Sequence, residues 1–142
     1  MFFPPSKYEK IIETDHNSYG DDKNYVIIGE WYSNNPVDIE ITCQTESNTY
    51  DYFVIYAGNN YSTGQFNPGT YLDTTGTLVD KTEIDDDIKF GGPQITKKFT
   101  NINIPNGVVV LRSNNSSSDY YGIYVKVSMT FEQKLYNNGL LY

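Results

Sequence analysis

The sequence has few of the residues on which enzymes and metal-dependent folds most often depend. Among its 142 residues there is one cysteine, Cys43, and one histidine, His16. A single cysteine excludes a disulfide framework, and one cysteine with one histidine excludes a zinc site built from these residue types. The ten basic side chains are outnumbered by eighteen acidic ones, which gives a net charge of −8. Because phosphate binding needs a basic patch, this balance argues against a nucleic-acid partner.

Long apolar segments are also missing. No stretch approaches the roughly 20 consecutive apolar residues of a membrane-spanning helix, so we expect no membrane partner. The N-terminus, Met-Phe-Phe-Pro-Pro, has neither a basic segment nor the apolar run of about 7–15 residues that marks a secretory signal. We therefore expect either a complete protein made in the cytoplasm or a piece of a longer one. The scarcity of alanine and leucine argues against a helical bundle.

The sequence is rich in residues that suit strands. Val, Ile, Thr, Tyr, Phe and Trp make up 57 of the 142 residues, and they pack well on a pleated, half-buried surface. Val37–Cys43 alternates apolar and polar residues, and Tyr120–Phe131 places six apolar side chains at every second position. Residues 50–57 are apolar on both faces, which predicts a central strand. Asn106-Gly107 is a tight-turn signal between strands.

About seven to nine short strands separated by turn signals predict an all-β chain with a single antiparallel β-sandwich or jelly roll. We expect two parts. Residues 1–24 form an extended N-terminal arm, because Pro4-Pro5 favours an extended backbone, and residues 25–142 form the sandwich domain. Such an arm can add a strand to a neighbouring subunit, and a loosely packed terminus is the alternative.

Catalytic chemistry has few candidates in this sequence. Asp15-His16 is not a catalytic triad, because adjacent residues rarely have the geometry that a triad needs, and we interpret His16 as an exposed loop histidine. Glycoside hydrolysis needs two carboxylates across a cleft, and nothing in the sequence places two in this way. Gly91-Gly92-Pro93 lacks the Lys-Ser/Thr pair of a phosphate-binding loop. We therefore predict that the protein is not an enzyme and has no organic cofactor.

Two kinds of loop residue are candidates for binding. Oxygen-rich loops, above all the acidic stretch Asp80–Asp87, could supply calcium ligands, and the alternative is that they are solvated loops that keep the protein soluble. Tyrosine and asparagine in loops suit recognition surfaces and could contact sugars, although an AT-rich genome would also enrich them. The predicted binding-surface residues are Asn59, Asn60, Tyr61, Tyr120 and Tyr121.

Two parts of the sequence resemble CUB domains. Thr49–Gly58 is similar to the central strand of these domains. Their later pattern of an apolar strand, a serine-rich loop and a further strand is similar to Val108–Ser113, the serine-rich loop after it and Tyr121–Val125. The resemblance implies a β-sandwich that serves binding, often through calcium, although the disulfides of the family are absent. It implies three calcium ligands, which would be Asp51, Glu46 and Asn114. Asn114 stands where the family has a loop aspartate.

The same strands are similar to β-sandwich modules in virion proteins of phages that infect gut Bacteroidetes, through residues 50–58 and 95–127. This resemblance implies a non-enzymatic protein of the virion that decorates or cements a phage capsid or tail. Its partners would be other virion or surface proteins, and a homo-oligomer is a further option. The alternative is an extracellular or cell-surface module of the adhesin type, which would bind a glycan or a receptor with or without calcium.

Overall fold

The computed structural model describes residues 7–19, 25–59, 61, 66, 68–114 and 119–130. These residues form nine strands and one short 3-10 helix. In chain order they are β1 (Lys7–Glu13), β2 (Val26–Tyr32), β3 (Val37–Gln44), β4 (Tyr52–Ala57), β5 (Gly69–Leu72), β6 (Leu78–Lys81), η1 (Asp86–Ile88), β7 (Ile95–Ile102), β8 (Asn106–Arg112) and β9 (Gly122–Thr130). Within this part of the chain, no helix has the length and apolar character needed to cross a membrane.

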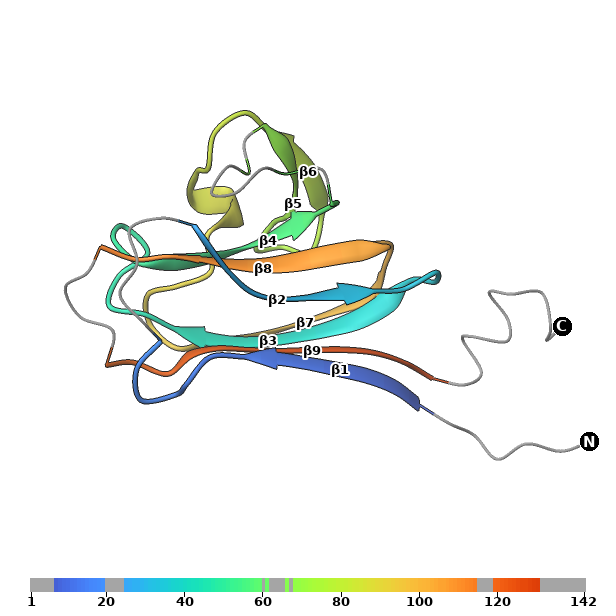
Figure 1. Ribbon diagram of the computed structural model, residues 1–142, viewed down its shortest axis with the longest axis horizontal. Coiled ribbons are helices and arrows are strands. Elements are labelled where there is room, and N and C mark those ends of the chain that lie inside the picture. The colour runs from blue at the N-terminus through green and yellow to red at the C-terminus, as the bar shows by residue number, and fades with distance from the viewer. Residues whose placement is uncertain are drawn as a thin grey trace, which may run out of the picture.

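The strands form two antiparallel sheets that pack face to face (Figure 1). One sheet has the order β1-β9-β3-β7, and the other has the order β2-β8-β4-β5-β6. Apart from the consecutive strands β4, β5 and β6, each strand is followed in the chain by a strand of the other sheet. The predicted all-β fold with a single antiparallel sandwich is therefore confirmed.

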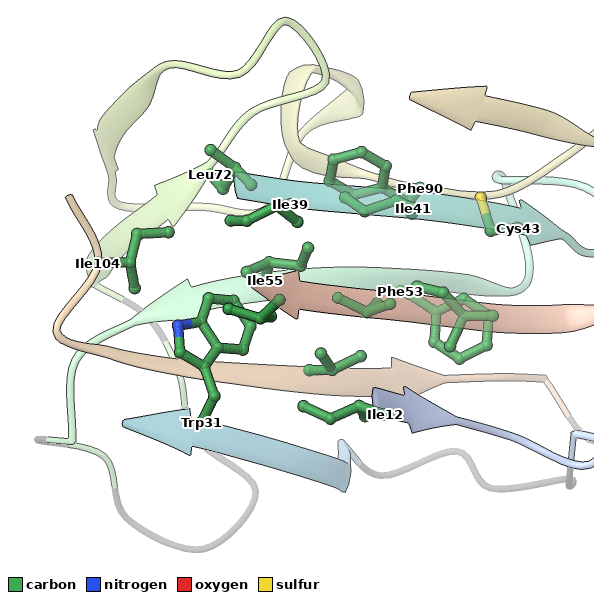
Figure 2. Packing of buried hydrophobic residues seen from close by; sticks show 14 of the residues in the cluster. Ile12, Trp31, Ile39, Ile41, Cys43, Phe53, Ile55, Leu72, Phe90 and Ile104 are labelled. Atoms are coloured by element: carbon green, nitrogen blue, oxygen red, sulfur yellow. The ribbon is translucent and has the colours of Figure 1, made fainter. Parts of the chain in front are cut away.

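The main core lies between the sheets and follows from the alternating sequence pattern. Every second side chain of β3, from Val37 to Cys43, is at most 1% exposed, and the apolar positions of β9 from Ile123 to Met129 are buried with them. The facing sheet contributes Trp31 and Phe53, and Figure 2 shows how these side chains fill the space between the layers. Each fully buried aliphatic or aromatic side chain stabilises the fold by about 1.5–3 kcal/mol.

A second apolar cluster lies on the outer face of the five-stranded sheet. It explains why β4 is apolar on both faces: Phe53 and Ile55 point into the main core, whereas Val54 and Tyr56 point into the second cluster. Ile88 of η1 is among the residues that complete this cluster. The prediction of a central strand at residues 50–57 is thus confirmed, because β4 is the third of five strands and its core-facing and outer-facing side chains are both buried.

Part of the predicted N-terminal arm is a strand of the chain's own sandwich. All seven residues of β1 pair with β9, from Lys7 opposite Thr130 to Glu13 opposite Tyr124. Ile12 is 4% exposed and packs into the main core. The four-stranded sheet therefore includes residues of the predicted arm, which add a strand to the sheet of their own chain. Residues 1–6 and 20–24 of the arm lie outside the described residues.

Candidate functional site

Asp51, which the family resemblance singles out, is a buried carboxylate just before β4. It is 1% exposed. Its Oδ2 accepts a hydrogen bond from the Tyr19 hydroxyl, and its Oδ1 accepts one from the Asn114 backbone N–H at 2.9 Å. The backbone of Asp51 is held as well, because its carbonyl accepts from the Thr45 hydroxyl at 2.9 Å and its N–H donates to the Ser47 carbonyl at 2.8 Å. Asp51 therefore connects three loops at one end of the sandwich.

Tyr19 brings the predicted calcium ligands into one neighbourhood. Burial, and then its hydrogen bond to Asp51, raise the pKa of the Tyr19 hydroxyl, whereas a backbone hydrogen bond from Glu46 acts in the opposite direction. The hydroxyl therefore stays protonated at neutral pH and donates to Asp51. Glu46, Asp51 and Asn114 thus all belong to the surroundings of Tyr19 or of the carboxylate that it contacts.

The contacts at this cluster are those of a structural carboxylate. Asn114 contributes a backbone N–H to Asp51, which is a hydrogen-bond donor and not a metal ligand. Within the ranges that the structure describes, no group of three or more His, Cys, Asp or Glu side chains is placed to hold a metal ion. The calcium site stays a prediction. Sequence reasoning missed Tyr19, because nothing in the polar pattern of residues 14–18 indicates that the next residue is buried.

The four predicted binding-surface residues that the structure describes lie in different parts of the fold. Tyr61 packs into the second cluster, stacked on Phe66 with ring centroids 4.9 Å apart. Tyr120 packs against the main core, and Tyr121, just before β9, stacks on His16 at 4.0 Å. Asn59 comes shortly after the last residue of β4, Ala57, and lines a cavity of about 270 Å³. Asn60 lies outside the described residues.

His16 connects the segment before Tyr19 to the start of β9 through its contacts with Tyr121. Its Nδ1 lies 2.7 Å from the Tyr121 carbonyl oxygen, and its Nε2 lies 3.5 Å from a carboxylate oxygen of Glu13. The ring is stacked on the Tyr121 ring with an interplanar angle of 5°. These contacts hold two chain segments together, and the exposed part of the His16 side chain is about one third (34%).

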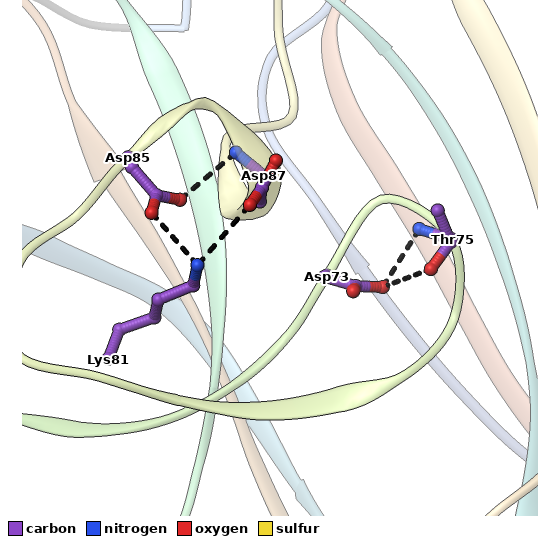
Figure 3. Close-up of polar contacts among 5 residues, drawn as sticks. All are labelled: Asp73, Thr75, Lys81, Asp85 and Asp87. Atoms are coloured by element: carbon purple, nitrogen blue, oxygen red, sulfur yellow. Dashed lines mark hydrogen bonds and ion pairs between the residues drawn. The ribbon is translucent and has the colours of Figure 1, made fainter.

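The acidic stretch Asp80–Asp87 is folded around a lysine. Lys81 Nζ lies 2.8 Å from a carboxylate oxygen of Asp85 and 3.3 Å from one of Asp87 (Figure 3). Asp85 also caps η1 by accepting from the Asp87 backbone N–H at 3.1 Å, and the hydrogen bond from Lys81 is the main cause that lowers the pKa of Asp85. Asp85 and Asp87 thus have a local structural partner in Lys81.

One side of the sandwich exposes apolar side chains. There β1 and β2, edge strands of different sheets, contact each other, and we call this side the β1/β2 edge (Figure 1). Four of the six exposed large hydrophobic residues in the described ranges lie on these strands: Tyr8, Ile11, Ile27 and Tyr32. Ile11 is 49% and Ile27 is 42% exposed. Each of the two isoleucines points away from the core on the outer face of its own sheet, so one lies on either side of the β1/β2 edge.

The direction in which the Ile11 backbone groups point follows from the pairing of β1 with β9. The Thr14 N–H donates to the Ile123 carbonyl at 3.0 Å, in register with the β1–β9 ladder. Hydrogen-bonded and non-hydrogen-bonded positions alternate in an antiparallel pair. The backbone groups of Lys10 and Ile12 therefore form hydrogen bonds with β9, whereas those of Ile11 point to the side of β1 that faces away from β9. In the described part of the chain, no strand pairs with β1 on that side.

Comparisons with known proteins add little to this picture. No family model matches the sequence, and no curated protein matches it. Among solved structures, the fold is similar to that of the SPBc2 prophage-derived protein YomS, with a TM-score of 0.43 and 11% sequence identity over 92% of this chain and 97% of that chain. A similarity of this size carries no argument about function. The resemblances to CUB domains and to phage modules therefore stay predictions.

Proposed function

We propose that this protein is a non-enzymatic structural component of a phage particle, and that it attaches to a capsid or tail through the β1/β2 edge. The observation that carries the proposal is that the backbone groups of Ile11 point to the side of β1 on which no described strand pairs, beside the exposed Ile11 side chain. An unpaired strand edge is a template for pairing with another chain, and proteins usually protect such edges. Addition of a partner strand to β1 would satisfy these backbone groups and cover Ile11.

The other sheet edges have a short strand or a break in register, and β1 has neither. The edge strand β6 has only four residues. The edge strand β7 carries Lys97 and Lys98, and its pairing with β3 has a register shift. The pairing of β2 with β8 also shifts register, between Ile27 and Gly29. Short strands, lysines and bulges are the common means of blocking edge pairing. β1 also carries Lys7 and Lys10, but its seven residues pair with β9 without a break in register, so β1 is the most regular edge for a partner strand.

Charged residues on β1 make this edge selective. Glu9 and Lys10 are exposed next to Ile11. Like charges placed opposite each other across two strands are destabilising, so only a partner strand with a matching charge pattern would pair well. The phage setting itself is supported by the resemblance of residues 50–58 and 95–127 to modules of phage virion proteins.

The test uses substitutions at a position whose N–H faces the free side. Ile11→Pro removes that N–H without removing a hydrogen bond to β9, so the sandwich should fold while strand addition is blocked. We expect the purified wild-type protein to sediment with phage particles from its own source, and Ile11→Pro to stay in the supernatant. Ile11→Thr keeps the N–H and should bind at an intermediate level.

Leu78→Thr is the matched control, because Leu78 is 38% exposed on the short edge strand β6. It should sediment like the wild type, and thermal unfolding should show that all variants are folded. A folded Ile11→Pro variant that sediments as well as the wild type would rule out the β1 edge. Absence of the wild-type protein from the particle fraction would rule out the proposed function as a whole.

A further inference from the structure

A cavity at the end of the sandwich shares Tyr32 with the β1/β2 edge, and its other lining residues lie outside that edge. It opens where β4 ends and β8 begins, and its volume is about 270 Å³. Its lining residues are Tyr32, Ala57, Gly58, Asn59, Pro105 and Asn106. Backbone hydrogen bonds fix the loops that form it: the Gly58 N–H donates to the Asn106 carbonyl and the Ser33 N–H to the Pro105 carbonyl, both at 2.8 Å. The cavity is therefore part of the folded scaffold.

The chemistry of the lining is selective. None of its residues is charged, although 20% of the residues in the chain are. Tyr32 is 69% exposed and offers an aromatic face, and Pro105 adds a second apolar surface. The carboxamide groups of Asn59 and Asn106 make no hydrogen bond within the described part of the chain and can both donate and accept. Few polar groups on a largely apolar wall are typical of small-molecule sites.

We propose that this cavity binds one residue of an uncharged sugar. A sugar ring has an apolar face of C–H groups, which suits the Tyr32 ring, and hydroxyl groups at its rim, which suit the amides of Asn59 and Asn106. The volume lies just below the range of about 300–1,000 Å³ that holds drug-sized ligands, so it fits a single ring at the end of a glycan. The lining contains no cation and the protein has a net charge of −8, so an acidic sugar is disfavoured.

The sugar site and the docking proposal are tested at different residues, because Ile11 does not line the cavity. The probes are glucose, galactose, mannose and N-acetylglucosamine, with sialic acid as the anionic comparison, each titrated at millimolar concentration and observed by saturation-transfer NMR. We expect at least one of the neutral sugars to bind and sialic acid not to bind. Tyr32→Ala should weaken binding about tenfold by removing the ring, whereas Tyr32→Phe should keep it.

Asn106→Ala should weaken binding about fivefold, through loss of a hydrogen bond. Tyr50→Ala is the matched control, because Tyr50 is 51% exposed and precedes β4, at the opposite end of that strand from the cavity. It should bind like the wild type. The proposal is overturned if no neutral sugar binds, if sialic acid binds best, or if folded Tyr32→Ala keeps wild-type affinity.

Discussion

The hydrogen bond between Tyr19 and Asp51 should stabilise the fold measurably, and Asp51→Asn is the sharpest perturbation of it. The substitution keeps the size of the side chain but replaces one carboxylate oxygen by an NH₂ group. One oxygen can still accept from the Asn114 N–H or from the Tyr19 hydroxyl, but the other donor then faces the NH₂ group. A buried donor without an acceptor and the loss of a charged acceptor both destabilise the folded state.

The magnitude follows from the number of bonds lost. A hydrogen bond to a charged group contributes about 1.5–3 kcal/mol to the free energy of unfolding, so Asp51→Asn should lower it by about 2–3 kcal/mol. Asp51→Ala removes both acceptors and should cost about 3–5 kcal/mol. Tyr19→Phe removes one bond and leaves Asp51 with the Asn114 N–H, so we expect a loss of about 1.5–3 kcal/mol.

The assay is urea unfolding followed by the fluorescence of Trp31, the single tryptophan, which is 2% exposed in the main core. Because Tyr19 and Asp51 are in contact, the double variant Tyr19→Phe/Asp51→Asn should lose clearly less stability than the sum of the single variants. Asp86→Asn, at a side chain that is 84% exposed, is the matched control and should leave the unfolding midpoint unchanged. Additive losses within about 0.5 kcal/mol would refute a direct interaction.

Two further predictions concern buried ionisable side chains. Burial is the main cause that raises the pKa of Tyr52 and Tyr71. The folded state therefore favours their neutral hydroxyls, and this contribution to stability is complete below the unfolded-state pKa of about 10 and is lost as the pH rises above it. The melting temperature should fall above about pH 10, and it should fall less steeply in Tyr71→Phe. Cys43 is fully buried, which raises the pKa of its thiol to about 12. Iodoacetamide should therefore label Cys43 only after the protein is unfolded in urea. Rapid labelling of the folded protein would contradict this burial.

The parts of the fold that the sequence predicted are those in which one strand carries a complete alternating pattern. In β3 and β9 every second residue is apolar and buried, so local periodicity suffices to place these strands. β1 is different, because Lys10 interrupts the apolar positions, and among residues 8–13 only Ile12 is buried. Its identity as a strand depends on pairing with β9, more than 100 residues later in the chain, and a local pattern does not contain that information.

The candidate sites depend on non-local features in the same way. The resemblance to a binding family singled out Asp51, but the role of this carboxylate is set by Tyr19 and Asn114, which are distant in the sequence. The tyrosine and asparagine pattern includes Asn59 of the cavity but not Tyr32, because it applies to loops and Tyr32 is the last residue of a strand.

A bulge in β2 decides the orientation of Tyr32. Val26 pairs with Leu111, whose side chain belongs to the main core, so strict alternation from Val26 would also turn Tyr32 inward and Trp31 outward. The register shift between Ile27 and Gly29 reverses this, because a slip of one residue moves every later side chain to the other face. As a result Trp31 is buried and Tyr32 is exposed at the cavity. The core of this sheet and its proposed sugar site therefore depend on the same irregularity.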